Sequence, residues 1–298
     1  GPDGGAEGGP DGGPEGGTVI SALRGRVRRA ERRRGRVQFV FQDPLRSLDP
    51  ELTVDRIVGE GLAIRGTDPG ETRTRVISSL EKTGLDASLL SRTPGQISGG
   101  QRQRVAIARA LAAGPELLIC DEPVSALDAS NRNYVLRLLG QLRDSLGLSI
   151  LIISHDLSSL AGIADRVAVL YRGRIVEDGP VGEVFADPGH PYTALLMASA
   201  PGLRERGSRE RGLREGGPRP DQNLTVRQLR RTAADPEPPS GPDACGFAAR
   251  CPFAADPCAT TPERVVTAGA AEGSFGIRGV ACHRHGEWPA LAATREEA

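Results

Sequence analysis

Three short apolar runs, far apart along the chain, restrict the possible fold more than any other feature of the sequence. They are VQFVF at residues 37–41, ELLIC at 116–120 and SILIIS at 149–154. Each is too short for a buried helix and rich in aliphatic residues, so each is predicted to be a strand buried on both faces. The stretches between them carry helical patterns at residues 73–85, 102–113 and 131–147. This alternation predicts an α/β fold with a largely parallel sheet.

Composition excludes several classes of protein. The 38 basic and 38 acidic residues cancel, so there is no global electrostatic case for binding nucleic acid or a membrane surface. No run approaches the roughly 18 apolar residues of a membrane span, and the first residues do not resemble a signal peptide. We therefore expect a soluble chain.

Composition also changes along the chain and suggests its segments. Residues 1–17 contain only Gly, Pro, Asp, Glu and Ala and are predicted to be disordered. The arginine-rich run that follows has no aromatic residue for base stacking, which favours a solvated helix face over a nucleic-acid arm. The predicted segments are a disordered N-terminal part (1–36), the α/β domain (37–200, with a helical subdomain at about 45–115), a low-complexity linker (201–243) and a cysteine-rich segment (244–285). A hairpin is predicted at 167–179, turning at Arg172 and Gly173.

Polar residues follow each of the three predicted strands. Gln42 follows the first, Asp121 and Glu122 the second, and His155 the third. Ligands bind at the carboxyl ends of strands in open α/β sheets, and a carboxylate there can hold Mg²⁺ while its neighbour orients an attacking water. Taken singly, each of these residues also fits a simple structural role, such as a strand cap or a turn.

The sequence ISGGQ at 97–101 opens the second helical pattern. A helix N-terminus offers unsatisfied backbone N–H groups and a favourable dipole to a phosphate. The simpler interpretation is a helix N-cap by Ser98 followed by a glycine turn. A further short segment, SALD at 125–128, comes directly after the second strand and its acidic pair.

The order of these motifs over about residues 37–200 resembles the nucleotide-binding subunits of ATP-binding cassette (ABC) transporters. The resemblance implies an ABC-type nucleotide-binding domain, a partial P-loop NTPase core with a helical subdomain, that takes ATP and Mg²⁺. At the strand ends it implies that Gln42 is the Q-loop residue, Asp121 the Walker B aspartate, Glu122 the catalytic glutamate and His155 the switch histidine, with Gln42 and Asp121 contacting Mg²⁺. It also implies that Ser98, Gly99, Gly100 and Gln101 form the signature motif and that Ser125 to Asp128 form the D-loop.

The tail resembles the oligopeptide and dipeptide importer branch of this family. ADPGHPYTALLMASAP at 186–201 and the cysteine segment carry the resemblance, which implies that the segment binds an iron–sulfur cluster. The cysteines Cys245, Cys251, Cys258 and Cys282 have the spacing C-x5-C-x6-C-x23-C, which fits neither a zinc ribbon nor a ferredoxin run. A 4Fe–4S cluster, a zinc ion and no metal all stay open, and His283 or His285 could replace a ligand.

The sequence departs from the family in one respect. The loop Gly-x4-Gly-Lys-Ser/Thr (Walker A) is absent, and the single lysine, Lys82, lies in ISSLEKTG. Charge-assisted hydrogen bonds contribute about 1.5 to 3 kcal/mol each. The loss is therefore predicted to weaken phosphate binding by more than roughly 5 kcal/mol, which raises the dissociation constant at least about a thousandfold. Because the chain begins at Gly1 and its one methionine is Met197, we expect a fragment or a processed chain.

These observations predict the ATP-binding subunit of an importer for peptides or related small solutes, poorly active alone. The alternative is a catalytically defective partner that lends its signature motif in trans to a complete ATPase subunit. A third class, a cytosolic ABC ATPase of DNA repair or translation, is disfavoured by the cysteine segment. The expected partners are a second ATP-binding subunit in a head-to-tail dimer, membrane permease subunits and, indirectly, an extracytoplasmic solute-binding protein, with no nucleic acid. The expected location is the cytoplasmic face of the membrane.

Overall fold

The computed structural model describes residues 35–200, 225–268 and 277–295. The chain divides into two compact units, Gly1–Ile153 and Ser154–Ala298, which are described here one at a time. The segment predicted to be disordered lies outside the described residues up to residue 34, and so does the predicted linker up to residue 224.

The first unit is built on a parallel sheet of three strands in the order β1-β2-β3. These strands are β1 (Val37–Val40), β2 (Leu117–Asp121) and β3 (Ser149–Ile153). Val40 pairs with Cys120 and Asp121 pairs with Ile153, so the three carboxyl ends lie level at one edge of the sheet. The predicted parallel sheet and its strands are confirmed.

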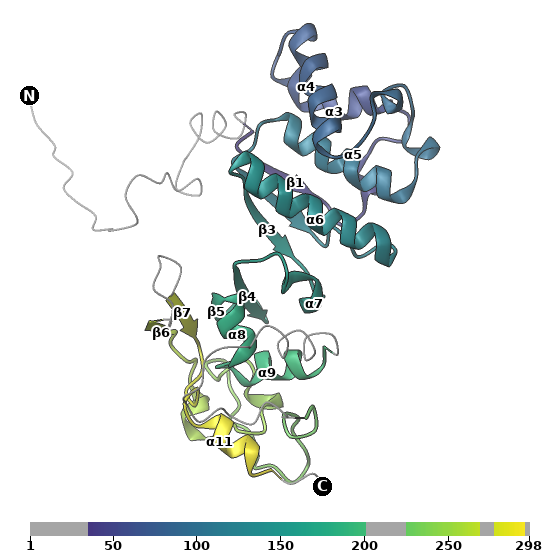
Figure 1. Ribbon diagram of the computed structural model, residues 1–298. Coiled ribbons are helices and arrows are strands. Elements are labelled where there is room, and N and C mark those ends of the chain that lie inside the picture. Colours follow the sequence, from purple (N-terminus) through teal and green to yellow (C-terminus); the bar gives the residue numbers. More distant parts are fainter. Residues whose placement is uncertain (1–34, 201–224, 269–276, 296–298) are drawn as a thin grey trace, which may run out of the picture. The chain divides into compact units, whose positions relative to one another are not determined.

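Helices fill the sequence between these strands (Figure 1). They are α2 (Pro44–Ser47), α3 (Val54–Ile64), α4 (Pro69–Lys82) and α5 (Gly99–Ala112) between β1 and β2, with the 3-10 turns η2 (Ala87–Leu89) and η3 (Pro94–Gln96), and α6 (Ala129–Leu146) between β2 and β3. Helices α3, α4 and α5 pack on one another through fully buried aliphatic residues, among them Ile57, Leu80 and Ile107. The three predicted helical patterns are confirmed.

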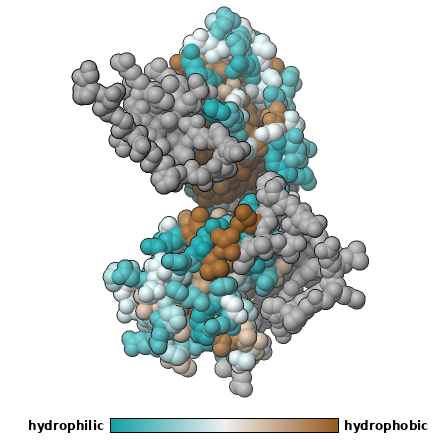
Figure 2. All heavy atoms as spheres, turned by 90° about the vertical axis from the view of Figure 1, so that its left-hand side faces the viewer, coloured by the Kyte–Doolittle hydropathy of each residue, from teal (hydrophilic) through white to brown (hydrophobic). Residues whose placement is uncertain are grey.

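The prediction that the strands are buried on both faces is wrong for the described residues. Leu118 and Cys120 on β2 are fully buried, whereas Phe39 is 46% exposed, Leu151 52% and Ile153 50%. Among the described helices, α5 contacts β1 and α6 contacts β3, but the only buried strand residues are Val40 on β1 and the alternate residues Leu118 and Cys120 on β2. The aliphatic runs therefore form a sheet with one covered face and one exposed apolar face. Figure 2 shows hydrophobic atoms (brown) at the surface of this unit.

The second unit contains an antiparallel sheet in the order β4-β5-β7-β6. Its strands are β4 (Arg166–Tyr171), β5 (Arg174–Pro180), β6 (Val265–Ala268) and β7 (Ile277–Val280). The predicted hairpin is confirmed: β4 and β5 join at Arg172 and Gly173, whose φ angles are +47° and +79°. Two successive positive φ angles are typical of the turn that suits the twist of a tight hairpin.

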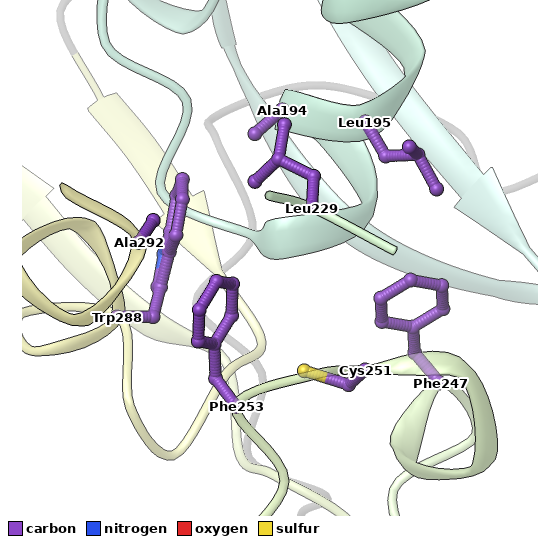
Figure 3. Packing of buried hydrophobic residues seen from close by; sticks show 8 residues of the cluster. All are labelled: Ala194, Leu195, Leu229, Phe247, Cys251, Phe253, Trp288 and Ala292. Atoms are coloured by element: carbon purple, nitrogen blue, oxygen red, sulfur yellow. The ribbon is translucent and has the colours of Figure 1, made fainter. Parts of the chain in front are cut away.

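Short helices and a hydrophobic cluster complete this unit. The helices are α7 (Leu157–Leu160), α8 (Val181–Ala186), α9 (Pro191–Ala198) and α11 (Trp288–Ala293), with the 3-10 turns η4 (Ala248–Arg250) and η5 (Asp256–Ala259). Figure 3 shows the cluster, formed by Ala194, Leu195, Leu229, Phe247, Cys251, Phe253, Trp288 and Ala292. Leu229 is 1% exposed although it belongs to the segment predicted as a linker, so the described end of that segment contributes to the fold.

A buried ion pair holds the start of α9 against this sheet. The side chain of Glu177 on β5 is inaccessible to solvent and accepts a hydrogen bond from Arg278 Nη2 on β7 at 2.6 Å. The same carboxylate accepts hydrogen bonds from the backbone N–H groups of Gly189 at 2.8 Å and His190 at 3.0 Å. Because both carboxylate oxygens accept hydrogen bonds and one of them pairs with Arg278, these contacts offset part of the cost of burying this charge.

Among the described residues, no helix is both long enough and apolar enough to cross a membrane.

Because only one face of the first sheet is covered, replacing leucine by alanine is predicted to change the free energy of unfolding by different amounts on β2 and β3. Leu118→Ala removes a side chain that is 0% exposed and is expected to lower the free energy of unfolding by about 2–5 kcal/mol. Leu151→Ala, at a position 52% exposed, is expected to cost less than about 1 kcal/mol. Urea unfolding followed by circular dichroism measures both. Equal losses would contradict the exposed face.

Candidate functional site

The carboxyl edge of the parallel sheet brings together three of the predicted site residues. Asp121 is the last residue of β2, and Glu122 follows it. Gln42, two residues beyond β1, donates a hydrogen bond from Nε2 to Glu122 Oε2 at 2.8 Å. These two residues are 80 positions apart in sequence, so the parallel pairing of β1 with β2 is what joins them.

Glu122 has an unusual backbone conformation for a residue with a side chain. Its φ angle is +43°, in the left-handed region, which costs roughly 1–2 kcal/mol for a residue other than glycine. Its N–H donates to Ile153 O at 2.9 Å, and its carbonyl accepts from Ser125 N at 3.2 Å and Ser125 Oγ at 3.1 Å. The sheet and the following turn therefore hold this conformation, and such strain is concentrated at functional sites.

The signature segment forms the N-terminus of α5. Ser98 is the N-cap: its Oγ accepts from Gln101 N at 3.2 Å, and Gln101 Oε1 accepts from Ser98 N at 2.8 Å. This reciprocal pair is a capping box, so the structural role weighed in the sequence is present. Gly99 and Gly100 occupy the first turn, whose N–H groups are those that a helix leaves unsatisfied. Phosphate binding by this segment stays a prediction.

The D-loop segment ends in the N-cap of α6. Asp128 accepts hydrogen bonds from Asn131 N at 3.0 Å and from Asn131 Nδ2 at 2.7 Å. These bonds, the backbone one first, lower the pKa of the Asp128 carboxyl below its usual value. Asn131 is a contact that the sequence reasoning missed: an Asp just before a helical pattern is a recognisable N-cap, but no local rule marks Asn131 as its partner.

His155 follows β3 by two residues and has an exposed side chain. It belongs to the second compact unit, whereas Gln42, Asp121 and Glu122 belong to the first. Its predicted approach to a terminal phosphate therefore stays a prediction.

The four cysteines of the C-terminal segment line one pocket. Cys245, Cys251, Cys258 and Cys282 share its wall with His190 and Phe247, and none of the four forms a disulfide. Figure 3 shows Cys251 beside Phe247 and Phe253. The surroundings are therefore largely apolar.

Burial is the main cause of the pKa shifts of three of these thiols. It raises the pKa of Cys251 and of Cys282 to about 12 and that of Cys245 above its usual value. Backbone N–H groups at Phe247, Phe253 and Arg284 oppose this rise in pKa by hydrogen bonding to the sulfur atoms. The thiols of Cys245, Cys251 and Cys282 are neutral at pH 7, so a metal would have to displace their protons.

The predicted metal centre has no preformed counterpart in the part of the chain that the structure describes. No group of three or more His, Cys, Asp or Glu side chains there is arranged to hold a metal ion. The pocket gathers the thiols but does not converge them on one point. The two histidines suggested as substitute ligands contact the main chain, His283 Nε2 at 3.0 Å from Thr260 O and His285 Nδ1 at 3.1 Å from Cys282 O.

Comparison with known proteins follows the same division of the chain. Residues 13–125 match the profile of the ABC transporter family, and residues 176–258 match that of the oligopeptide/dipeptide transporter C-terminal region. A putative peptide import ATP-binding protein of Brucella ovis is 42% identical over 243 residues, which cover 81% of this chain and 71% of the relative. The chain belongs to the ABC transporter ATP-binding proteins.

Other members of this family show similar levels of identity. The dipeptide transport ATP-binding protein DppF of Haemophilus influenzae is 42% identical over 76% of this chain and 64% of its own length. The oligopeptide transport ATP-binding protein OppF of Escherichia coli is 43% identical over the same shares. The solved structure of cbiO1 from Clostridium perfringens, part of the ABC transporter complex cbiONQ, is similar with a TM-score of 0.51 and 30% identity, covering 62% of this chain and 71% of that one. The ABC-type fold predicted from the motifs is confirmed.

Because of its positive φ angle, position 122 is predicted to be more stable with glycine than with alanine, the reverse of the usual order in a strand. Glu122→Gly is expected to be more stable than Glu122→Ala by about 1 kcal/mol, because glycine adopts a positive φ without a steric penalty. At Asp121, which lies in β2, alanine is expected to be better than glycine by about 0.5–1 kcal/mol. Thermal unfolding of the four variants checks both orders, and the same order at both positions would contradict a left-handed Glu122.

Proposed function

We propose that this ABC protein is the ATP-binding subunit of an importer for peptides or related small solutes, and that it couples ATP binding and hydrolysis to transport. The hydrogen bond between Gln42 Nε2 and Glu122 Oε2, at 2.8 Å, carries the proposal, because it joins the Q-loop residue to the catalytic glutamate at the ligand-binding edge of the sheet. The peptide and dipeptide names of the relatives support the class of solute.

In this proposal each residue at the sheet edge has a separate task. Asp121 supplies carboxylate oxygen to Mg²⁺, which prefers such ligands and keeps several waters, and Gln42 supplies an amide oxygen without adding charge. Mg²⁺ neutralises charge on the terminal phosphates when bound. Glu122 orients and deprotonates the attacking water, and His155 donates to the terminal phosphate.

The signature and D-loop residues act on a second site in this proposal. Ser98, Gly99, Gly100 and Gln101 present the start of α5 to the nucleotide of a partner ATP-binding subunit in a head-to-tail dimer, with Asp128 beside that contact. Within the 298 residues, Lys82 is the sole lysine and lies outside any Gly-x4-Gly-Lys-Ser/Thr loop. The phosphate loop is therefore supplied by further residues of the same polypeptide or by another one.

The proposed assembly follows from this role. The dimer contacts permease subunits at the cytoplasmic face of the membrane, and an extracytoplasmic solute-binding protein delivers the solute to those permeases. The names of the relatives favour this importer subunit over the catalytically defective partner considered from the sequence, because each is described as an import or transport ATP-binding protein.

The role of Glu122 is tested in the assembled importer. Glu122→Gln is expected to lower the rate of ATP hydrolysis by about 10²- to 10⁴-fold, because the amide cannot take a proton from water. ATP binding, measured by equilibrium dialysis, is expected to persist. The matched control is Glu116→Gln, just before the opposite end of β2, where the carboxylate is 64% exposed and pairs with Arg36. Full hydrolysis by Glu122→Gln would contradict the assignment.

We propose in addition that the four cysteines bind a 4Fe–4S cluster. Their shared pocket, the apolar wall and the backbone N–H groups directed at sulfur support this, since cluster thiolates need donors of that kind. The fit requires the thiols to lose protons and to converge when the metal enters. Zinc is the competing occupant, because four thiolates also suit it.

Chemical analysis of the full chain decides the occupant. Anaerobic purification is expected to give about four iron and four acid-labile sulfide atoms per chain, with broad visible absorbance. Cys251→Ser is expected to lose most of both. Cys120→Ala, at the one cysteine outside the pocket, is expected to keep them. One zinc per chain without sulfide, or no metal at all, would contradict the cluster.

A further inference from the structure

Asn131, on the first turns of α6, lies against Gly100 in the first turn of α5. A Cβ atom added to Gly100 would lie 2.5 Å from Asn131 Oδ1 and 2.9 Å from Asn131 Cγ, and real Cβ atoms essentially never approach so closely. Gly100 is itself buried. The asparagine side chain therefore occupies the space that any other residue at position 100 would need.

The same side chain holds the end of the D-loop. Asn131 Nδ2 donates to Asp128 Oδ2 at 2.7 Å, while Asn131 N donates to Asp128 Oδ1 at 3.0 Å. One carboxamide therefore contacts the signature turn with its oxygen and the Asp128 carboxylate with its nitrogen. Because the carboxamide is planar and rigid, a movement that changes its contact with Gly100 also changes its hydrogen bond to Asp128.

A second contact lies one turn further along both helices. The guanidinium of Arg104 on α5 lies 4.9 Å from the ring centroid of Tyr134 on α6. Arg104 also donates from Nε to Gly100 O at 3.3 Å and from Nη1 to Gly84 O at 2.8 Å. Gly100 is thus held on its Cα side by Asn131 and at its carbonyl by Arg104. These two contacts connect the start of α5 to the first turns of α6.

We propose that Asn131 is a positioning residue that couples the signature turn, Ser98 to Gln101, to the D-loop, Ser125 to Asp128. The inference rests on the proposed function, in which both segments serve the partner's nucleotide. Asn131 acts through these two segments and does not itself contact the nucleotide. A phosphate that orders the start of α5 thereby also orders the Asp128 cap, and a displaced D-loop weakens the phosphate contact by the same factor.

Hydrogen exchange on the full chain tests the coupling without any nucleotide. Asn131→Ala is expected to speed exchange of the amides of Gln101 and Arg102, which donate to Ser98, by about three- to tenfold, because both the packing on Gly100 and the side-chain bond to Asp128 are lost. The matched control is Asn133→Ala, an exposed asparagine two residues further along α6, which is expected to leave these rates unchanged. Equal rates in both variants would overturn the coupling.

A pair of substitutions separates coupling from simple loss of stability. Gly100→Ala alone clashes with Asn131 and is expected to unfold at lower temperature, whereas the double variant Gly100→Ala with Asn131→Ala removes the clash. The double variant is therefore expected to recover most of the lost melting temperature, which is a non-additive result. Additive losses would show that the two residues do not meet and would overturn the inference.

Kinetics of the assembled importer give the functional readout. Asn131→Ala is expected to raise KM for ATP by about five- to tenfold with kcat within about twofold, because it weakens a binding contact and leaves Glu122 in place. Asn131→Asp, which keeps the shape but cannot donate to Asp128, is expected to raise KM as well. An unchanged KM in both variants would overturn the inference. If the unaltered importer hydrolyses no ATP, the proposed function fails, and the exchange and double-variant results still decide the coupling.

Discussion

The parallel pairing of β1, β2 and β3 is the constraint on which the site of the first unit depends. In a parallel sheet the carboxyl ends of all strands lie at one edge, and here the register brings them level. Gln42 and Glu122 then meet across 80 residues of sequence at 2.8 Å. The hydrogen bond from Glu122 N to Ile153 O continues the pairing one residue past β2 and holds a strained backbone in place. A slip of one residue between β1 and β2 would separate Gln42 from the glutamate.

The second unit depends on a different interaction, the buried carboxylate of Glu177. It joins β5 to Arg278 on β7 and to the backbone of Gly189 and His190, which opens α9. His190 then caps that helix with Nδ1, which accepts from Tyr192 N at 3.0 Å. Burial lowers the pKa of His190 to about 4, so the ring stays neutral and keeps this acceptor at physiological pH. The GHPY sequence at 189–192 therefore connects the sheet to the elements that line the cysteine pocket.

Local patterns made the strands, the helices and the hairpin predictable, because each depends on neighbours in sequence. The same patterns predicted that Gln42, Asp121 and Glu122 lie at one edge of the sheet, since residues at the ends of parallel strands converge wherever the strands pair. Contacts between distant segments were not predictable in this way. Burial of Leu229 and the ion pair of Glu177 with Arg278 depend on tertiary packing, and no local signal marks them. Two-sided burial of the strands was inferred from their composition, but a strand's composition does not determine which elements cover the sheet.

Trp288 gives the molecule a built-in spectroscopic reporter. It is the only tryptophan of the chain, is 1% exposed, and donates from Nε1 to Gly189 O at 2.7 Å beside the ring of Phe253. Its emission, excited at wavelengths where tyrosine scarcely absorbs, therefore comes from the second unit alone. Loss of packing around Gly189 shifts that emission to the red. The folding of the second unit can thus be followed in the intact chain without any label.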